Sequence, residues 1–142
     1  MATRRSSARW EGTLKGGKGT FKGESGAIGG QYSFSSRFEE GVGSNPEELL
    51  AAAEAACFSM ALSGGLEKNG TVATSIETNA ACTVESREGD TRITKMHLDV
   101  TATVPGIDDA KFQELANATL TGCPVSKAFQ GNMEITMTAK LA

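Results

Sequence analysis

Apolar residues are densest between Leu49 and Leu62, and their spacing predicts a helix from Pro46 to about Ser63. They occupy nearly every side of that helix: Leu49, Leu50, Ala52, Ala53, Ala56, Phe58, Met60 and Leu62. A helix that lacks a polar face belongs in the middle of a structure. We therefore expect one long central helix with the rest of the chain packed around it.

Polar residues and glycines mark the two ends of this helix. Asn45 suits the N-cap, Pro46 suits the first helical position, and Glu48 falls at the third position of a capping box. At the other end, we expect Gly64-Gly65 to stop the helix, or a brief restart as far as Gly70.

Short strands are predicted before the helix, where glycine is dense from Gly12 to Gly43. The segments between these glycines have the composition of strands, at residues 8–14, 19–22 and 31–37. We expect them to form hairpins and a meander.

After the helix, apolar and polar residues alternate over two long runs, as they do in half-buried strands. The apolar face of the first run carries Ile76, Ala80, Cys82 and Val84. The apolar face of the second run carries Met96, Leu98, Val100, Ala102 and Val104. A turn at Glu88-Gly89-Asp90 fits a hairpin between them.

Two more helices and a last strand are predicted in the remaining chain. Asp108 can cap a helix that Gly122 closes, Cys123-Pro124 begins a short helix, and residues 132–141 form a strand. The order is then βββ-α-ββ-α-α-β, in which strands that follow one another are expected to pair. We predict an α+β fold, with mostly antiparallel sheets packed around the central helix, in a single domain over residues 1–142.

Composition and charge exclude several classes of protein. A chain of 142 residues, 39% of them hydrophobic, suffices for one core, and a net charge of −3 without a basic run argues against nucleic acid as a partner. No stretch resembles a signal peptide, and the most apolar segment is shorter than the roughly 20 residues of a membrane span. We expect a cytoplasmic protein that does not bind a membrane.

Three cysteines in a cytoplasmic chain are core thiols, metal ligands or redox groups rather than a disulfide framework. A metal site is poorly supported, because the chain has no CxxC pair and its one histidine, His97, lies on the polar face of a strand. Cys82 lies on the apolar face of its strand, which indicates a core residue.

The other two cysteines have different local contexts. Cys123 lies at the start of a helix, where free backbone N–H groups favour a thiolate, but its local sequence leaves a reactive and a structural role equally open. Cys57 lies in the middle of a helix and would by itself be a core residue. It becomes reactive only if a cation from elsewhere lowers its thiol pKa.

The cysteine contexts also carry a resemblance to a known family. Residues 45–49 and 55–58 resemble the NPE and ACF motifs of the OsmC/Ohr family, and residues 122–126 resemble that family's second cysteine motif. Further matches follow in the same order as in OsmC proteins: Trp10-Glu11-Gly12, Gly17-Lys18-Gly19, Thr74-Ser75-Ile76 and Val104-Pro105-Gly106-Ile107. The resemblance covers nearly the whole chain.

What the resemblance implies is a thiol-dependent peroxidase that protects against oxidative or osmotic stress and prefers organic hydroperoxides to hydrogen peroxide. Cys57 matches the peroxidatic cysteine, Cys123 the resolving cysteine and Glu47 the acid of the NPE motif. The family's arginine matches Arg37, with Arg9 as the second choice. A dithiol is the implied reductant, with a lipoylated protein as one candidate, and no motif for a metal or a cofactor is present.

The same family pattern, combined with helix geometry, predicts an intertwined homodimer. Glu47 and Cys57 are ten residues apart on one predicted helix, so about 15 Å of helix axis separates them. An antiparallel copy of the helix that crosses near Ala52 would bring Glu47 of one chain level with Cys57 of the other. The alternative is that the first turn is not helical and folds back within one chain.

Two other functions compete with the peroxidase. An apolar pocket could serve a small-molecule or lipid carrier that merely keeps two thiols. The Cys123-Pro124-Val125-Ser126 segment is also similar to the CxxS motif of thiol–disulfide exchange proteins, although here it follows a helix rather than a strand.

Overall fold

The computed structural model describes residues 1–142, and the chain divides into two compact units, Met1–Leu49 and Leu50–Ala142. Its elements are β1 Ser6–Glu11, β2 Lys18–Gly23, β3 Gly29–Tyr32, α1 Phe34–Phe38, α2 Pro46–Lys68, β4 Ser75–Arg87, β5 Asp90–Thr103, α3 Asp109–Gly122, α4 Pro124–Phe129 and β6 Glu134–Leu141. The α+β class and the order of elements are as predicted, except that α1 is added. That the whole chain forms a single domain stays a prediction.

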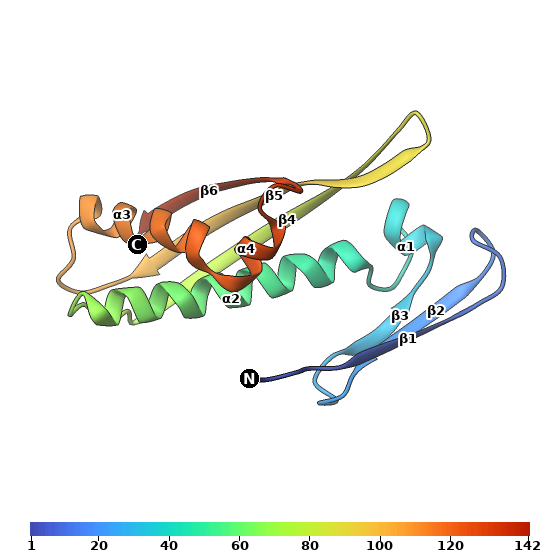
Figure 1. Ribbon diagram of the computed structural model, residues 1–142, viewed down its shortest axis with the longest axis horizontal. Coiled ribbons are helices and arrows are strands. Elements are labelled where there is room, and N and C mark those ends of the chain that lie inside the picture. The colour runs from blue at the N-terminus through green and yellow to red at the C-terminus, as the bar shows by residue number, and fades with distance from the viewer. The chain divides into compact units, whose positions relative to one another are not determined.

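The N-terminal unit contains the predicted meander, in which β1, β2 and β3 pair antiparallel in sequence order (Figure 1). Gly19 permits close packing here, because a Cβ at this position would lie 2.5 Å from the Tyr32 ring. The rings of Tyr32 and Trp10 accordingly pack over β2, with their centroids 5.5 Å apart.

The predicted strand at residues 31–37 is wrong from Ser33 onward, because β3 ends at Tyr32 and a short helix follows. Ser33 caps that helix: its hydroxyl accepts from the Ser36 N–H at 3.1 Å, and the Ser36 hydroxyl accepts from the Ser33 N–H at 2.9 Å. This reciprocal capping box fixes a helical turn in a segment whose alternation of apolar and polar residues is typical of a strand. The consequence is that Arg37 lies on a helix, in α1.

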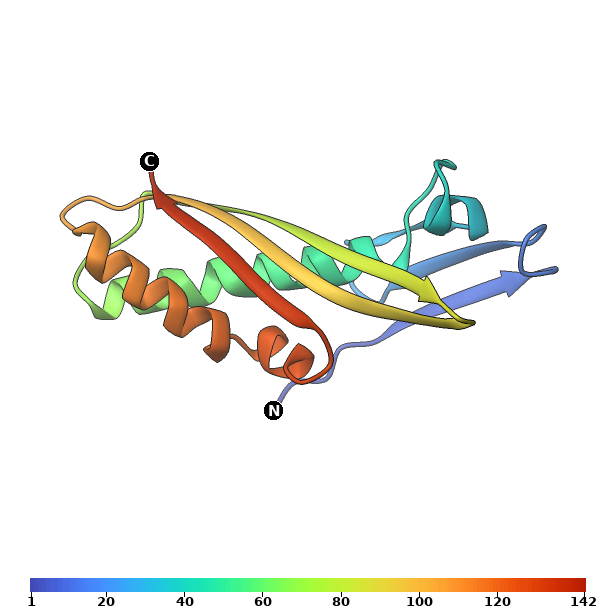
Figure 2. The ribbon, with the colours of Figure 1, turned by 90° about the horizontal axis from the view of Figure 1, so that it is seen from above.

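The C-terminal unit is a three-stranded sheet, β4-β5-β6, with α2 and α3 along one of its faces (Figures 1 and 2). Its core joins side chains from α2, β5 and α3: Phe58, Leu62, Leu66, Met96, Leu98, Val100, Ala102, Val104, Phe112 and Ala116. The apolar face predicted for the second long strand is therefore the buried one. The apolar residues of β4, Cys82 among them, are half-buried against the same core.

The last strand pairs in a different direction from the other strands. The β4–β5 hairpin is antiparallel, but β6 pairs with β5 in parallel, from Lys95 beside Glu134 to Ala102 beside Leu141. Parallel strands need a long crossover connection, which α3 and α4 supply here. The expectation that strands following one another pair is confirmed, and most strand pairs are antiparallel as predicted, but the β5–β6 pair is parallel.

Helix α2 begins as predicted and ends later than predicted. Asn45 Oδ1 accepts from the Glu48 N–H at 2.8 Å, and the Glu48 carboxylate accepts from the Ser44 hydroxyl at 2.6 Å. The helix then continues through Gly64-Gly65 to Lys68, because Leu66 is buried in the core. It stops where Gly70 adopts a φ of +82°, a conformation that glycine adopts at no steric cost.

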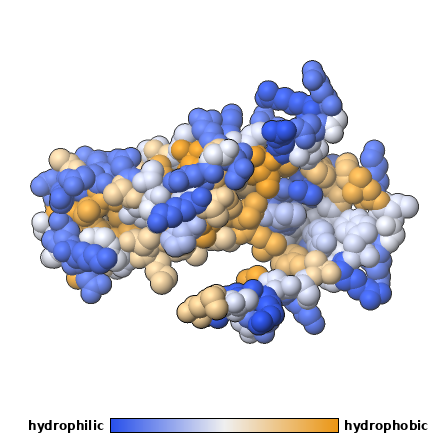
Figure 3. Space-filling model, in the orientation of Figure 1, coloured by the Kyte–Doolittle hydropathy of each residue, from blue (hydrophilic) through white to orange (hydrophobic).

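The greater length changes how the helix compares with a membrane span. At 23 residues, α2 could cross a membrane by length and composition alone, and the argument that the apolar segment is too short is wrong. The buried helix of a soluble protein meets the same criterion. One face of α2 is exposed in this chain: Ala52, Ala53, Ala56, Met60 and Ser63. Part of the molecular surface is correspondingly apolar (Figure 3), and Met60 is 80% exposed.

Candidate active site

The sulfurs of Cys57 and Cys123 lie 2.9 Å apart and share a hydrogen bond, although 66 residues separate them in the chain. They are not joined in a disulfide, which would place the sulfurs about 2.05 Å apart. Cys57 is half-buried in the middle of α2, and Cys123 is buried at the start of α4. The structure therefore brings together the two cysteines that the family resemblance assigns to one site.

Cys123 stands at the junction of two helices, as its sequence context predicts. Its backbone N–H donates to the Thr119 carbonyl at 2.9 Å and ends α3. Its sulfur accepts from the Ser126 N–H at 3.5 Å and caps α4, whose first residue is Pro124.

The surroundings of Cys57 disfavour ionisation of its thiol. Burial raises the pKa of the Cys57 thiol, and the hydrogen bond with Cys123 raises it further. A backbone hydrogen bond from Val125 lowers that pKa, while the negative charges of Cys123 and Glu54 raise it. The groups of its own unit that act on this pKa include no cation. A positive charge that activates Cys57 must therefore come from outside that unit.

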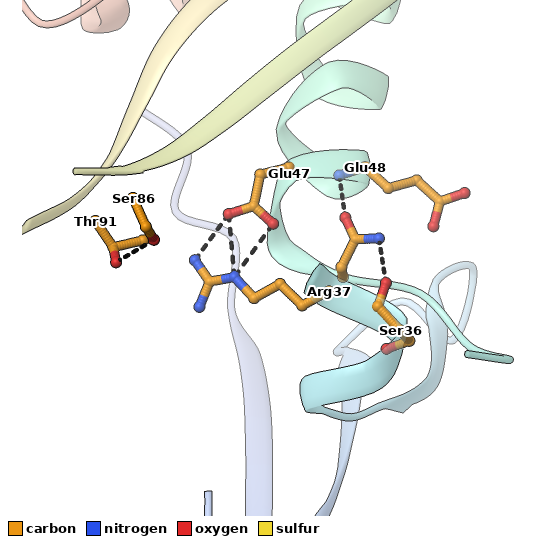
Figure 4. A network of polar contacts seen from close by, with 7 residues as sticks. Ser36, Arg37, Glu47, Glu48, Ser86 and Thr91 are labelled. Atoms are coloured by element: carbon orange, nitrogen blue, oxygen red, sulfur yellow. Dashed lines mark hydrogen bonds and ion pairs between the residues drawn. The ribbon is translucent and has the colours of Figure 1, made fainter. Parts of the chain in front are cut away.

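Arg37 and Glu47 form an ion pair in the N-terminal unit (Figure 4). Arg37 Nη2 lies 2.7 Å from Glu47 Oε1, and Arg37 Nε lies 3.2 Å from both carboxylate oxygens. The Glu47 side chain is 6% exposed and that of Arg37 is 34% exposed, so the guanidinium keeps an open side. The pair combines the arginine and the acid that the resemblance assigns to the site.

The elements that carry this pair are fixed to each other by hydrogen bonds. Asn45 Nδ2 donates to the Ser36 carbonyl at 3.1 Å (Figure 4), and the Ser36 hydroxyl donates to the Ser44 carbonyl at 2.7 Å. These bonds hold α1 against the start of α2. Arg9, the second choice, lies on β1 and pairs with Glu11 at 2.8 Å, with 76% of its side chain exposed.

An aromatic pocket of about 230 Å³ lies beside Arg37 in the same unit. The residues that line it are Trp10, Leu14, Tyr32, Ser33, Phe34, Arg37 and Phe38. The Phe34 and Phe38 rings contact each other, with their centroids 5.1 Å apart. Such a pocket can hold an apolar group while its one cation faces a polar or anionic atom.

Sequence reasoning missed a buried polar pair next to the cysteines. Glu54 is fully buried on α2, and one of its carboxylate oxygens accepts a hydrogen bond from the Ser126 hydroxyl. Burial raises the pKa of the Glu54 carboxyl, and the Ser126 bond lowers it in part. The available signal was the position of Glu54, which interrupts an apolar helix one turn before Cys57.

The other two candidate residues, Cys82 and His97, do not contact the Cys57–Cys123 pair. Cys82 packs against the core from β4, as predicted. His97 lies on the other face of the sheet, with Nδ1 2.6 Å from the Thr136 hydroxyl and Nε2 3.5 Å from Asp99 Oδ1. No group of His, Cys, Asp and Glu side chains in the chain could hold a metal ion.

A pair of free thiols in contact, presented by a core helix and by a helix start, defines a thiol-based redox protein. The family model described as OsmC-like protein matches residues 39–138, a span that includes Glu47, Cys57 and Cys123. The chain belongs to the OsmC-like family.

Individual relatives agree with this membership. The chain is 45% identical to the peroxiredoxin OsmC of Escherichia coli (strain K12) over 94% of its own length and 93% of that protein. It is 34% identical to the organic hydroperoxide resistance protein OhrB of Bacillus subtilis (strain 168) over 70% of its length and 71% of OhrB. The crystal structure of OhrB matches with a TM-score of 0.78 and 28% identity over 98% of each chain.

Proposed function

We propose that the protein reduces organic hydroperoxides to alcohols, with Cys57 as the attacking thiol and Cys123 as the resolving thiol. It is a peroxidase, and hydroperoxide detoxification is the role that its relatives support. The 2.9 Å contact between the two sulfurs carries the proposal. A thiol this close can condense with an oxidised Cys57 before a second peroxide oxidises it further.

The proposed reaction has three steps. The Cys57 thiolate attacks one oxygen of the hydroperoxide, the O–O bond breaks, and the alkoxide leaves and takes a proton. Cys57 then carries a sulfenic acid, which condenses with the Cys123 thiol to a disulfide and water. An external dithiol reduces the disulfide, and a lipoylated protein is one candidate for that dithiol. The reaction requires no cofactor.

Arg37 has two tasks in this scheme. Its positive charge lowers the pKa of the Cys57 thiol, which the surroundings of Cys57 otherwise raise. Its guanidinium also stabilises the negative charge that grows on the leaving oxygen. The two-point ion pair with Glu47 fixes the guanidinium for both tasks.

The aromatic pocket beside Arg37 supports organic hydroperoxides over hydrogen peroxide as substrates. Its apolar lining can hold the organic group of the substrate while Arg37 binds the peroxide oxygens. Hydrogen peroxide has no organic group to fill the pocket and is expected to react more weakly. Three relatives are named for organic hydroperoxide resistance, which agrees with this preference.

The site is completed in a homodimer under this proposal. Glu47 and Cys57 lie ten residues apart in α2, which is helical from Pro46, so the alternative of a non-helical first turn is wrong. A helix of that length separates their backbones by about 15 Å. The exposed apolar face of α2, which begins at Ala52, is where a second α2 would pack. Arg37 and Glu47 of one subunit would then serve Cys57 of the partner.

The proposal is tested by steady-state consumption of cumene hydroperoxide and of hydrogen peroxide, each with a monothiol and with a dithiol reductant. Catalytic turnover that is faster with cumene hydroperoxide and with the dithiol supports it. Consumption that stops after one equivalent per chain would indicate a carrier that merely keeps two thiols. Location in the cytoplasm, away from membranes and nucleic acid, stays a prediction.

A further inference from the structure

Glu54 is fully buried in α2, three residues before Cys57, and apolar residues lie on either side of it. One carboxylate oxygen, Oε1, accepts a hydrogen bond from the Ser126 hydroxyl, while Oε2 is buried without a hydrogen-bond partner. Burial raises the pKa of this carboxyl, because the charged form loses its water. An apolar side chain would fill the position with less loss of stability. Stability alone therefore does not explain the Glu54–Ser126 bond.

Ser126 connects Glu54 to the resolving cysteine through two different groups. Its hydroxyl donates to the Glu54 carboxylate, and its backbone N–H donates to Cys123 Sγ at 3.5 Å. Both Ser126 and Cys123 are buried. The two bonds start from one residue, so a contact that holds Ser126 against α2 also holds the Cys123 sulfur there.

Helix α4 depends on its side chains for its position. It has six residues, Pro124–Phe129, and a helix this short is not stable by itself. The residues that flank it, Cys123 and Gln130, leave the helical conformation, so neither neighbouring element continues into it. Phe129 packs against the core at the last turn. At the first turn, the bond from Ser126 to Glu54 is a buried anchoring contact.

We propose that Glu54 is a positioning residue for the resolving step. Its bond to Ser126 holds the first turn of α4 against α2, which keeps the Cys123 sulfur within reach of the oxidised cysteine. This inference rests on the proposed function. In the resolving step, the Cys123 sulfur attacks the Cys57 sulfur, the S–S bond forms, and the S–O bond of the sulfenic acid breaks. The hydroxide that leaves takes the proton of the Cys123 thiol, and water is released.

The need for this bond arises when Cys57 is oxidised. In the reduced protein, the Cys123 thiol donates to the Cys57 sulfur at 2.9 Å, and this contact keeps the two sulfurs together. Attack on a hydroperoxide adds an oxygen to the Cys57 sulfur, and the contact must then rearrange. The Glu54–Ser126 bond contains neither sulfur, so the oxidation does not alter it. It holds Cys123 in place while a second peroxide competes for the sulfenic acid.

Three variants separate the hydrogen bond from the charge of Glu54. Ser126→Ala removes the hydroxyl and leaves the backbone N–H that contacts Cys123. Glu54→Gln removes the charge and keeps an oxygen that can accept from the Ser126 hydroxyl. The double variant Glu54→Leu/Ser126→Ala removes both partners, so no polar atom of this pair is left buried and unpaired. It is expected to fold with unchanged or higher stability.

The experiment follows one turnover of each reduced protein with cumene hydroperoxide by rapid quench. Loss of peroxide reports the first step, mass spectrometry of Cys57 and Cys123 reports the disulfide, and urea denaturation reports stability. In Ser126→Ala and in the double variant, we expect disulfide formation to slow by on the order of 10-fold, with sulfinic acid on Cys57. The first step should not slow, because α2 carries Cys57. Glu54→Gln should form the disulfide at close to the wild-type rate.

Ser59→Ala is the matched control for the loss of a serine hydroxyl. Ser59 also lies in α2, two residues after Cys57, and its hydroxyl is 2.8 Å from that of Thr78 in β4. Both steps should keep their rates in this variant. If the control slows disulfide formation as much as Ser126→Ala does, the inference is overturned, because any change near Cys57 would then suffice.

The outcomes separate this inference from the proposed function. Disulfide formation at the wild-type rate in the double variant would overturn the role of Glu54. Equal slowing of both steps would also overturn it, because that result indicates a structural role. So would a Glu54→Gln rate as low as that of Ser126→Ala, because the charge rather than the hydrogen bond would then be required. If the wild-type protein consumes no hydroperoxide, or if Cys57→Ser remains active, the proposed function fails, whatever these variants do.

Discussion

Arg37 is held by Glu47 through two nitrogens at once, with Nη2 2.7 Å from Oε1 and Nε 3.2 Å from both carboxylate oxygens. The guanidinium also lies 5.1 Å from the centre of the Phe38 ring. A planar cation with this many fixed contacts loses little freedom when a substrate arrives. The arrangement holds the Arg37 guanidinium in one orientation, unlike a mobile charge on the surface.

Arg37→Ala is expected to slow peroxide consumption at neutral pH by on the order of 10²-fold. The pKa of the Cys57 thiol rises when the cation is lost, so part of the rate should return at higher pH. The pH–rate profile of the first step measures this. Arg9→Ala is the control, because Arg9 is also paired with a glutamate but is largely exposed on β1. An unchanged Arg37→Ala profile would transfer the activating role to another cation.

Cys57→Ser is expected to abolish turnover, and Cys82→Ser is expected to retain it. Cys57 is the thiol in contact with Cys123, whereas Cys82 packs against the core from β4. Steady-state kinetics of the two purified variants, with circular dichroism to verify folding, decide the matter. Full activity in Cys57→Ser would contradict the assignment.

One equivalent of hydroperoxide is expected to produce a disulfide between Cys57 and Cys123 of the same chain. Their sulfurs already touch in the reduced protein, so little movement is needed. Peptide mapping without reductant identifies the bridge. In Cys123→Ser, the sulfenic acid on Cys57 should persist and proceed to sulfinic acid. A bridge to Cys82, or a sulfenic acid trapped first on Cys123, would reverse or replace the proposed roles.

Mixing Glu47→Ala with Cys57→Ser subunits is expected to restore about a quarter of wild-type activity, by the symmetry of a two-fold dimer. Half of the dimers are then mixed, and each mixed dimer has one site with both lesions and one intact site. Activity is measured after subunit exchange, with mass spectrometry to establish that the exchange has occurred. Proven exchange without recovery would mean that each site comes from a single chain.

Glu54→Gln is expected to stabilise the protein at neutral pH and to remove part of its pH dependence. The pKa of Glu54 is raised in the folded protein, so the folded state binds more protons than the unfolded state, and stability falls as the pH rises. That loss begins at the ordinary pKa of glutamate and ends above the raised pKa of the folded state. Urea denaturation of both proteins over this pH range measures the difference. If the free energy of unfolding depends on pH in the same way in wild type and variant, Glu54 does not carry a buried charge.

Much of the C-terminal unit could be predicted because its cues are local. The alternation along β4 and β5 places each side chain on one face, and Asp108 caps α3 by accepting from the Lys111 N–H at 2.8 Å. The parallel pairing of β6 could not be predicted, because it depends on a partner strand far away in the sequence. Helix α1 was missed because the Ser33–Ser36 capping box outweighs the strand-like pattern of its residues.

Some residues of the site could likewise be predicted from their neighbours in sequence, and others depend on distant contacts. Asn45 and Cys123 could be assigned to helix starts from their neighbours alone. The pairing of Cys57 with Cys123 came from the family resemblance, because no local pattern relates residues 66 positions apart. Glu54 can be related to the rest of the site only through its hydrogen bond with Ser126, which is 72 positions away. An acidic residue within an apolar helix is the feature that sequence reasoning can weigh more heavily.

The parallel placement of β6 beside β5 also determines the order in which the site can be assembled. The β4–β5 hairpin closes a short loop and can form early, whereas β6 can join β5 only after the crossover through α3 and α4 has been laid down. Cys123 lies within that crossover. During synthesis, Cys57 therefore leaves the ribosome well before Cys123, and the new chain carries a Cys57 thiol without this neighbour until its last third has folded.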